Sequence, residues 1–435
     1  MARKMKDSGI EWIGEIPEGW EVAKLKNIVS IVRGGSPRPI EAYMSDNDND
    51  VNWIRISDTE KGSKYITHTS RKLIASGISK SRFIKRGSLI LTNSMSFGEP
   101  YILDIDGCIH DGWVAFSDFK KIDKEFLYYF LTSPLAKIQF EQQVDGGVVK
   151  NLNIDKIGDT VILLPSLIDQ NKIIAHLDSL TSETNSLLSK TITSIEDYKK
   201  LKQAVITQAV TKGVRGEREM KDSGVEWVSY IPVDWNTIKL KYCTYIRARL
   251  GWRALKADEY VESGFPFLSA FNIVNNALHF TNLNYINQFR YDESPEIQLK
   301  VGDVLLVKDG AGIGKCAIVE NMPIPSTVNG SIAVLSSTSF ITPKYLYYYF
   351  LSEMFQQHID LLKDGMGVPH LFQSDLKEIK IAFPSKDEQK EIADYLDAKC
   401  AEIDGLIAKK EKLVKELESY KKSLIYEVVT GKREV

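Results

Sequence analysis

The sequence contains an internal duplication, which restricts the chain to folds built from two similar units. Residues 5–26 and residues 220–241 are identical at thirteen of 22 positions, at an offset of 215 residues. The identical positions include Trp20 and Trp235, and tryptophan occurs only seven times in the chain. Because so rare a residue recurs in register, chance is a poor explanation for the match.

A second set of matches closes each half of the chain. The tetrapeptide Tyr128–Leu131 recurs as Tyr348–Leu351, and further matches pair residues 145–178 with residues 364–397 at an offset of 219. Similarity is almost absent from the middle of each copy, residues 30–120 and 245–340. The sequence thus predicts one unit present twice, with constant ends and a divergent middle.

Both copies continue into a long amphipathic helix. Ser166 with Asp169, and Ser385 with Glu388, have the Ser-x-x-acid spacing of a capping box, which marks the start of a helix. Apolar residues then recur every three or four positions over roughly six heptads, as in the seam of a coiled coil. The predicted seam residues are Ile173, Leu177, Leu180, Leu187, Leu201 and Val205 in the first helix, and Leu396, Ile403, Leu413, Leu417 and Leu424 in the second. Thr184, Thr191 and Lys410 lie at or near seam positions.

Neither helix is expected to be stable alone with an apolar stripe facing water, so we expect the two to pair. A globular domain lies between them in the sequence, and the simplest return path makes them antiparallel. We therefore predict a mixed α and β fold, with two repeated globular α/β domains separated by two long helices that form an antiparallel coiled coil. The predicted boundaries are residues 1–165 and 214–384 for the domains, and 166–213 and 385–435 for the helices.

Composition excludes several classes of protein. Lys and Arg total 56 against 58 for Asp and Glu, so any nucleic-acid-binding surface must be a local patch. No run of about 18 apolar residues occurs, which argues against a membrane-spanning helix. The charged N-terminus lacks the apolar core of a secretory signal, and the four cysteines have no disulfide or metal-site spacing. We therefore expect a cytoplasmic protein with no membrane partner.

Basic residues gather in the divergent middle of both copies. Nine basic residues oppose two acidic ones from Arg55 to Arg86, and six oppose none from Lys239 to Lys256. Phosphates need cations, and an arginine fork also reads guanine edges. Glycine and serine within Arg33–Arg38 allow backbone N–H groups to approach phosphate. A solvated surface without a ligand is the alternative, and on the residues alone the two interpretations carry equal weight.

No catalytic constellation is recognisable in the sequence. Residues 310–315, GAGIGK, resemble a phosphate-binding loop, but the spacing is one residue short and Cys316 replaces the magnesium-binding Ser or Thr. A tight turn between strands is the preferred interpretation. The six histidines form no metal-spaced pair, and no nucleotide-cofactor fingerprint occurs. We therefore expect no metal and no cofactor in this chain.

The constant ends, divergent middles and two long helices resemble the specificity subunits of type I restriction–modification systems. The stretches that carry the resemblance are Trp12 to Leu25, Gly146 to Pro165, Gln170 to Asp178, their second copies, and Ser423 to Gly431. Together they span nearly the full length of the chain. The resemblance implies that each divergent middle is a target-recognition domain for one half of a split, asymmetric DNA target. It also implies that the helices fix the spacing between the half-sites.

The same resemblance implies the partners. These are double-stranded DNA, two modification (methyltransferase) subunits that bring S-adenosylmethionine and methylate adenine at its exocyclic amine, and restriction subunits where the system also translocates and cuts DNA. The chain itself is then a non-catalytic subunit. For the first half-site we predict Arg33, Ser36, Arg38, Arg55, Lys61, Arg71, Lys72 and Arg82 as DNA-binding residues. For the second we predict Arg247, Arg249, Arg253, Lys256, Lys308 and Lys315.

Two other functions compete with this hypothesis. A coiled-coil scaffold with duplicated peptide- or glycan-binding domains also fits the repeat, although the local basic runs argue against it. A self-contained methyltransferase is disfavoured because no cofactor-binding sequence is present.

Overall fold

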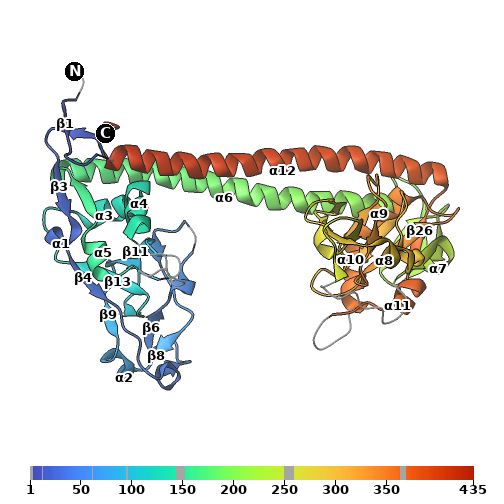
Figure 1. The fold of residues 1–435 in the computed structure, drawn as a ribbon, viewed down its shortest axis with the longest axis horizontal. Helices are drawn as coiled ribbons and strands as arrows, with labels where there is room; N and C mark the ends of the chain where they lie inside the picture. The colour runs from blue at the N-terminus through green and yellow to red at the C-terminus, as the bar shows by residue number, and fades with distance from the viewer. Residues whose placement is uncertain are drawn as a thin grey trace. The chain divides into compact units, whose positions relative to one another are not determined.

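The chain forms two compact units, each with a globular part and stretches of both long helices (Figure 1). The computed structural model describes residues 3–11, 13–60, 62–94, 97–143, 152–248, 259–362 and 369–435. Unit 1 comprises Met1–Ile192 with Glu411–Val435, and unit 2 comprises Thr193–Lys410. Within the described ranges, no helix has both the length and the apolar character required to cross a membrane.

Unit 1 contains two five-stranded sheets from the divergent middle of the first copy. The first sheet comprises, in spatial order, β4 (Ser30–Arg33), β13 (Trp113–Ser117), β10 (Leu89–Thr92), β11 (Pro100–Leu103) and β7 (Tyr65–Ile66). The second comprises β5 (Met44–Ser45), β8 (Lys72–Leu73), β6 (Val51–Ile54), β12 (Gly107–Ile109) and β9 (Arg82–Ile84). Leu89 and Leu91 pack into one core and Ile90 into another, because successive side chains of a strand alternate between faces. Strand β10 is therefore buried throughout and central.

Unit 2 repeats this plan with fewer strands. Its larger sheet comprises β18 (Thr244–Arg247), β26 (Ile332–Ser337), β23 (Val304–Val307) and β24 (Cys316–Ile318). Its smaller sheet comprises β22 (Asn284–Ile286), β19 (Phe265–Leu268) and β25 (Thr327–Val328), beside a hairpin of β20 (Ile273–Val274) and β21 (Ala277–Leu278). The order β18-β26-β23-β24 corresponds to β4-β13-β10-β11, and the parallel pair β19–β25 corresponds to β6–β12. The two middles therefore share a topology although their sequences barely match.

The constant ends of each copy pair with one another. Strand β3 (Glu21–Lys24) pairs with β14 (Val161–Leu164), and β17 (Asn236–Lys239) pairs with β27 (Lys380–Phe383), both antiparallel. Each pair joins the start of a copy to the segment that leads into a long helix. This pairing explains why the two flanks match between copies while the middles diverge.

A fully buried glutamine, which we call the glutamine latch, ties each long helix to its unit. The Gln389 Oε1 accepts a hydrogen bond from the Thr342 N–H at 2.7 Å. Its Nε2 donates to the carbonyl oxygens of Phe340 and Pro384, both at 3.0 Å. The equivalent partners of Gln170 are the Asp123 N–H at 2.7 Å and the carbonyl oxygens of Lys121 and Pro165 at 2.9 and 3.0 Å. Both amides are fully satisfied without water, as burial requires.

The latches align the two copies at an offset of 219 residues, which corrects one match read from the sequence. Helices α3 (Lys124–Thr132) and α9 (Pro343–Leu351) start beside the latches and end at buried serines. The Ser133 hydroxyl donates to the Phe130 carbonyl and the Ser352 hydroxyl to the Tyr349 carbonyl, both at 2.6 Å. Phe130 is therefore equivalent to Tyr349, and the tetrapeptide match was displaced by one residue. The error arose because both helices carry a run of buried aromatic residues.

The repeated Lys-Leu-Lys sequence holds one carboxylate in each unit. The Nζ atoms of Lys24 and Lys26 each lie 2.8 Å from Asp159 Oδ1. In unit 2, Lys239 and Lys241 lie 2.5 and 2.6 Å from the two carboxylate oxygens of Glu378. Hydrogen bonds from Lys239 and then Lys241 lower the pKa of Glu378 from 4.5 to about 2. These clamps attach the helix before β14 or β27 to the strand that pairs with it.

Glu378→Gln is expected to lower the melting temperature at pH 7 by a small amount that shrinks on acidification. A carboxylate whose pKa is depressed on folding adds stability above its unfolded pKa, here near 4.5, and loses it as the pH falls toward 2. The effect is small because solvent screens an exposed ion pair. Thermal melts of wild type and variant between pH 7 and pH 3 measure the difference. A difference that stayed constant over this range would contradict the assignment.

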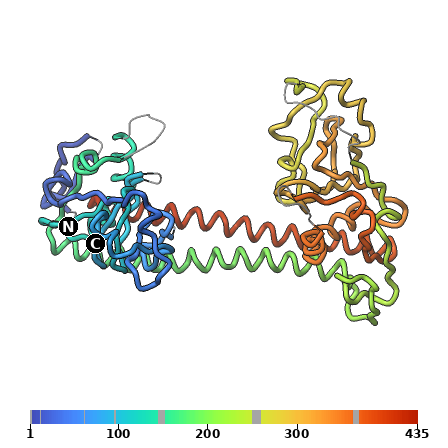
Figure 2. The backbone as a smooth tube through the Cα atoms, turned by 90° about the horizontal axis from the view of Figure 1, so that it is seen from below, coloured from blue at the N-terminus to red at the C-terminus, as the bar shows by residue number. Residues whose placement is uncertain are grey.

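The two long helices, α6 (Leu167–Lys212) and α12 (Lys386–Val429), run antiparallel within each unit (Figures 1 and 2). In unit 2, Lys410 lies over the Tyr198 ring at 5.7 Å, whereas Lys202 pairs with Asp404 at 2.6 Å, so rising numbers on α6 meet falling numbers on α12. In unit 1, the Lys421 Nζ donates to Asn185 Oδ1 at 2.7 Å. Closer to the start of α6, Ile173 and Leu177 share a core with Leu424 and Val428.

The observed seam differs from the predicted one near the middle of the helices. Ile173, Leu177, Leu396, Ile403 and Leu424 are buried, and Leu180, Val205 and Leu417 are partly buried. By contrast, Leu187, Leu201 and Leu413 are 46%, 47% and 38% exposed, so their assignment to the seam was wrong.

Threonines take the place of the missing leucines in the seam. Thr184 and Thr191 are buried, and their hydroxyls donate to the carbonyl oxygens of Leu180 and Leu187, each at 2.7 Å. The hydroxyl of such a threonine is satisfied by a carbonyl of its own helix and requires no water, so the residue can lie in an apolar seam. Both threonines were expected at or near the seam, whereas the exposed Leu187 and Leu201 lie on the neighbouring face of the helix.

Candidate nucleic-acid interface

Three residues predicted for the first half-site converge on one residue of unit 1, Asp111. The Arg33 Nε donates to the Asp111 backbone oxygen at 3.0 Å, and the Ser36 hydroxyl donates to Asp111 Oδ1 at 2.7 Å. The Arg38 guanidinium lies 3.6 Å from Asp111 Oδ2 and is 77% exposed. The hydrogen bond from Ser36 lowers the pKa of Asp111, so this carboxylate is charged at neutral pH. Two guanidinium groups against one carboxylate leave the loop with net positive charge.

The backbone explains why this loop has glycines. A Cβ on Gly34 would lie 2.1 Å from the His110 carbonyl oxygen, so only glycine fits. The close approach lets the Gly34 N–H donate to the Trp113 carbonyl at 2.9 Å and the Gly35 N–H to the Ile109 carbonyl at 3.1 Å. The loop is thus fixed on the ends of β12 and β13, and Arg33 and Arg38 project from a rigid base. Sequence reasoning missed Asp111, whose role depends on this fold.

The other candidates of unit 1 lie at the neighbouring sheet. Arg55 is held by the Ser70 hydroxyl at 2.5 Å and by the nearly buried Asp58 at 3.4 Å. The Lys72 Nζ donates to Asn52 Oδ1 at 2.7 Å. Arg71 and Arg82 are exposed, and Lys61 lies outside the described residues. Arg55 and Lys72 therefore already have protein partners, whereas Arg71 and Arg82 present their side chains to solvent.

In unit 2, the structure assigns Arg247 to an internal ion pair. Its Nη2 lies 2.6 Å from Asp303 Oδ2, and the Asp303 side chain is only 3% exposed. Its Nη1 donates to the carbonyl oxygens of Glu296 and Gln298 at 3.1 and 2.9 Å. This guanidinium joins β18 to the segment before β23, and its side chain is 20% exposed, so its DNA contact stays a prediction. Arg249, Arg253 and Lys256 lie outside the described residues.

The GAGIGK segment is a turn between strands, as predicted. Strands β23 and β24 are antiparallel neighbours, and the Val307 N–H donates to the Lys315 carbonyl at 2.9 Å. Lys315 at the end of the turn is exposed. Lys308 at its start is 13% exposed and pairs with Asp309 at 2.8 Å. Asp309 also contacts the ring of His370, so of the two lysines Lys315 is the one available to a phosphate.

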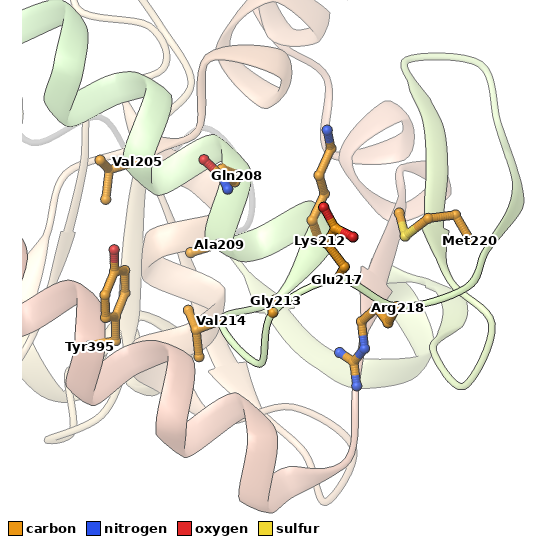
Figure 3. Close-up of a pocket in the computed structure, with 11 residues that line it drawn as sticks. Val205, Gln208, Ala209, Lys212, Gly213, Val214, Glu217, Arg218, Met220 and Tyr395 are labelled. Atoms are coloured by element: carbon orange, nitrogen blue, oxygen red, sulfur yellow. The ribbon is translucent and has the colours of Figure 1, made fainter.

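A pocket of about 620 Å³ lies in unit 2, away from both sheets (Figure 3). Its walls come from Val205 and Lys212 of α6, the segment that follows this helix, and Tyr395 of α12. Arg218 on its rim is bound to the buried carboxylate of Glu388. All these residues belong to the constant framework, so the pocket is separate from the candidate DNA-binding residues.

The described residues hold no group suited to metal binding or thiol chemistry. Across these ranges, no cluster of three or more His, Cys, Asp or Glu side chains has the geometry to hold a metal ion. Cys108, Cys243, Cys316 and Cys400 are free and buried, and burial raises the pKa of each thiol. A thiol with a raised pKa is a poor nucleophile at neutral pH.

Comparison with known proteins gives one consistent family. The family model for the type I restriction modification DNA specificity domain matches residues 17–197 and again residues 232–416. The chain is 25% identical over 429 residues to the type I restriction enzyme MjaVIII specificity subunit of Methanocaldococcus jannaschii, with 96% of this chain and 93% of the relative covered. It is 22% identical to the Escherichia coli EcoBI specificity subunit, with 93% and 84% covered.

Solved structures share the fold. A chain from a type I restriction–modification system, studied for complex assembly and conformational transition, aligns with a TM-score of 0.73 at 17% identity, covering 96% of this chain and 99% of that one. The HsdS subunit of Thermoanaerobacter tengcongensis aligns with a TM-score of 0.52 at 17% identity, covering 96% and 98%. The mixed α/β fold with two long helices agrees with the architecture expected from the sequence.

Proposed function

Because the chain belongs to the family of type I restriction–modification specificity subunits, we propose that units 1 and 2 each bind one half of a split DNA target. One observation carries the proposal: the two units share framework contacts and differ in the side chains that they expose. The glutamine latches and the Lys-Leu-Lys clamps recur in both. The Arg33–Arg38 loop of unit 1, RGGSPR, differs in sequence from the corresponding stretch of unit 2, residues 247–253, RARLGWR. Two readers with one scaffold and different surfaces recognise different half-sites, so the target is asymmetric.

We propose that the long helices set the spacing of the half-sites and bind two methyltransferase subunits. Both helices are continuous and contribute residues to both units. At 1.5 Å per residue each extends about 65 Å, which is about two turns of B-form DNA. Linking two readers makes the second half-site contact intramolecular, which multiplies the affinity through effective concentration.

We propose that the chain performs no chemistry itself. Its partners then supply S-adenosylmethionine and transfer the methyl group to the exocyclic amine of adenine, and restriction subunits add cleavage where the system has them. The described residues support this division because their cysteines are buried thiols and their candidate DNA-binding groups are cations and hydroxyls. Such groups bind phosphates and base edges.

Sequencing the methylated adenines of a host that expresses the chain with its methyltransferase partner tests the proposal. We expect one bipartite motif with two different half-sites and an unread gap of fixed length. The methyltransferase expressed without this chain is the control and should leave the motif unmethylated. Methylation without sequence preference, or a palindromic motif, would refute the two-reader proposal.

A further inference from the structure

Phe271 is 92% exposed, more than any other large apolar side chain among the described residues. It is the middle residue of the 3₁₀ turn η4 (Ala270–Asn272), which directly follows the buried strand β19. Burying a phenylalanine side chain stabilises a protein, and Phe271 gains none of this stabilisation in the free chain. A ring that the fold leaves exposed to water is suited to contact with a binding partner.

The turn that carries Phe271 is held rigidly. The Ser269 N–H donates to Asn272 Oδ1 at 3.0 Å, and the Phe271 N–H donates to the Ser269 hydroxyl at 3.3 Å. The Asn272 amide also donates to the Thr281 carbonyl at 3.2 Å, and Asn272 is buried. The hairpin that follows is anchored by the Tyr347 hydroxyl, which donates to the Asn276 carbonyl at 3.0 Å. The ring is therefore presented on a preorganised base, which lowers the entropic cost of binding.

A cation lies beside this turn. A Cβ placed on Gly312 would lie 3.8 Å from the Ala270 Cβ and 3.6 Å from the Lys315 Cδ. The backbone of Gly312, in the turn of residues 310–315, therefore lies directly beside the turn that carries Phe271. Lys315 is exposed, and Lys308 is already paired with Asp309. The surface thus combines one aromatic ring with one available ammonium group. Such a combination suits DNA, because its stacked bases are flanked by phosphates.

Unit 1 has the same turn with a different residue at its centre. The 3₁₀ turn η2 (Ile56–Asp58) follows β6, and the Arg55 N–H donates to Asp58 Oδ2 at 2.9 Å as the Ser269 N–H donates to Asn272 Oδ1 in unit 2. Strands β6 and β19 occupy equivalent positions because each pairs in parallel with its neighbour, β12 or β25. The middle residue of η2 is the exposed Ser57. Two domains that share the backbone conformation at one position but differ in its side chain can recognise different half-sites there.

We propose that Phe271 inserts between adjacent base pairs of the half-site bound by unit 2, with Lys315 on the flanking phosphate. The inference rests on the proposed function. A phenyl ring has no hydrogen-bonding group, so it selects steps that unstack easily instead of reading base edges. Ser57 makes no such wedge, so the half-site bound by unit 1 is not kinked at the corresponding step.

The test uses the full chain assembled with its methyltransferase subunits and DNA that carries the bipartite motif. Each adenine position of both half-sites is replaced in turn by 2-aminopurine, whose fluorescence rises when the base is unstacked, except the methylated adenines, which a methyltransferase flips out of the duplex in any case. We expect an increase at one step of the unit 2 half-site and none at the equivalent step of the unit 1 half-site. Phe271→Ala should abolish the increase and weaken binding about tenfold to a hundredfold, whereas Phe271→Leu should retain part of both.

Phe340→Ala is the matched control, because Phe340 is also an exposed phenylalanine of unit 2 but its carbonyl belongs to the glutamine latch. This variant should leave fluorescence and affinity unchanged. Unchanged fluorescence and affinity in Phe271→Ala would overturn the proposal, as would a loss of methyltransferase subunits from the assembly, which would mean that the ring contacts protein. If the wild-type complex showed no sequence preference, the proposed function itself would fail.

Discussion

Gln389→Leu is expected to lower the free energy of unfolding of the chain by about 2–4 kcal/mol. Leucine has a similar volume, so the variant creates little empty space and removes three hydrogen bonds. The Thr342 N–H and the carbonyl oxygens of Phe340 and Pro384 would lose their hydrogen-bond partner. Because the side chain of Gln389 is fully buried, water cannot easily replace it. Each buried polar group left without a partner costs about 1–3 kcal/mol, and partial relaxation reduces the sum. Urea denaturation followed by circular dichroism measures the change.

Gln170→Leu tests the same latch in unit 1 and should have a comparable effect, since its three hydrogen bonds match in kind and length. Gln142→Leu is the control, because Gln142 is exposed on α4 (Pro134–Gln143) and should change the free energy by less than about 0.5 kcal/mol. Equal effects of the control and latch variants would show that the amides contribute nothing beyond their volume.

The double variant Arg33→Ala with Arg38→Ala is expected to weaken binding of the assembled complex to its DNA target about tenfold to a hundredfold. A good bidentate contact to a base contributes about 1–3 kcal/mol, and each 1.4 kcal/mol corresponds to a factor of ten. If either arginine contacts phosphate, the slope of log affinity against log salt should fall by about 0.9 for that residue. Anisotropy titrations at several salt concentrations measure both quantities.

The loss should also be confined to one half-site. Adenine methylation in the double variant should become permissive at bases of the unit 1 half-site only, because both arginines belong to unit 1. Lys121→Ala removes another exposed cation of the same unit, one that pairs with Glu21 on the constant framework, and should leave affinity unchanged. Relaxed recognition at both half-sites would contradict the assignment of one reader to each unit.

Local signals in the sequence were sufficient for the framework of this molecule. The duplication, the helix starts at Ser166 and Ser385 and the GAGIGK turn each depend on neighbouring residues or on repetition, and the structure agrees with all of them. Arg33, Ser36 and Arg38, which the structure brings together at Asp111, could be grouped from sequence because they lie within six positions of one another.

Contacts between distant segments could not be read in the same way. The carboxylate that neutralises Arg247 is Asp303, 56 positions further along the chain, and a basic run gives no sign that one of its members is turned inward. Asp111 accepts a hydrogen bond from Ser36 of the first-site loop, lies 75 positions further along the chain, and was likewise missed. In the long helices, the leucines that looked like a seam compete with threonines whose hydroxyls are satisfied internally, and only packing decides between them.

The closing of each unit by its own two flanks, β3 on β14 and β17 on β27, has a consequence for inheritance. A gene segment that encodes one middle can be replaced while the strand pairing that closes its frame stays with the recipient. The divergent middles can therefore be exchanged between related genes, and even between the first and second copies within a single gene. New recognition would then arise in one genetic event instead of through a series of weakened intermediates.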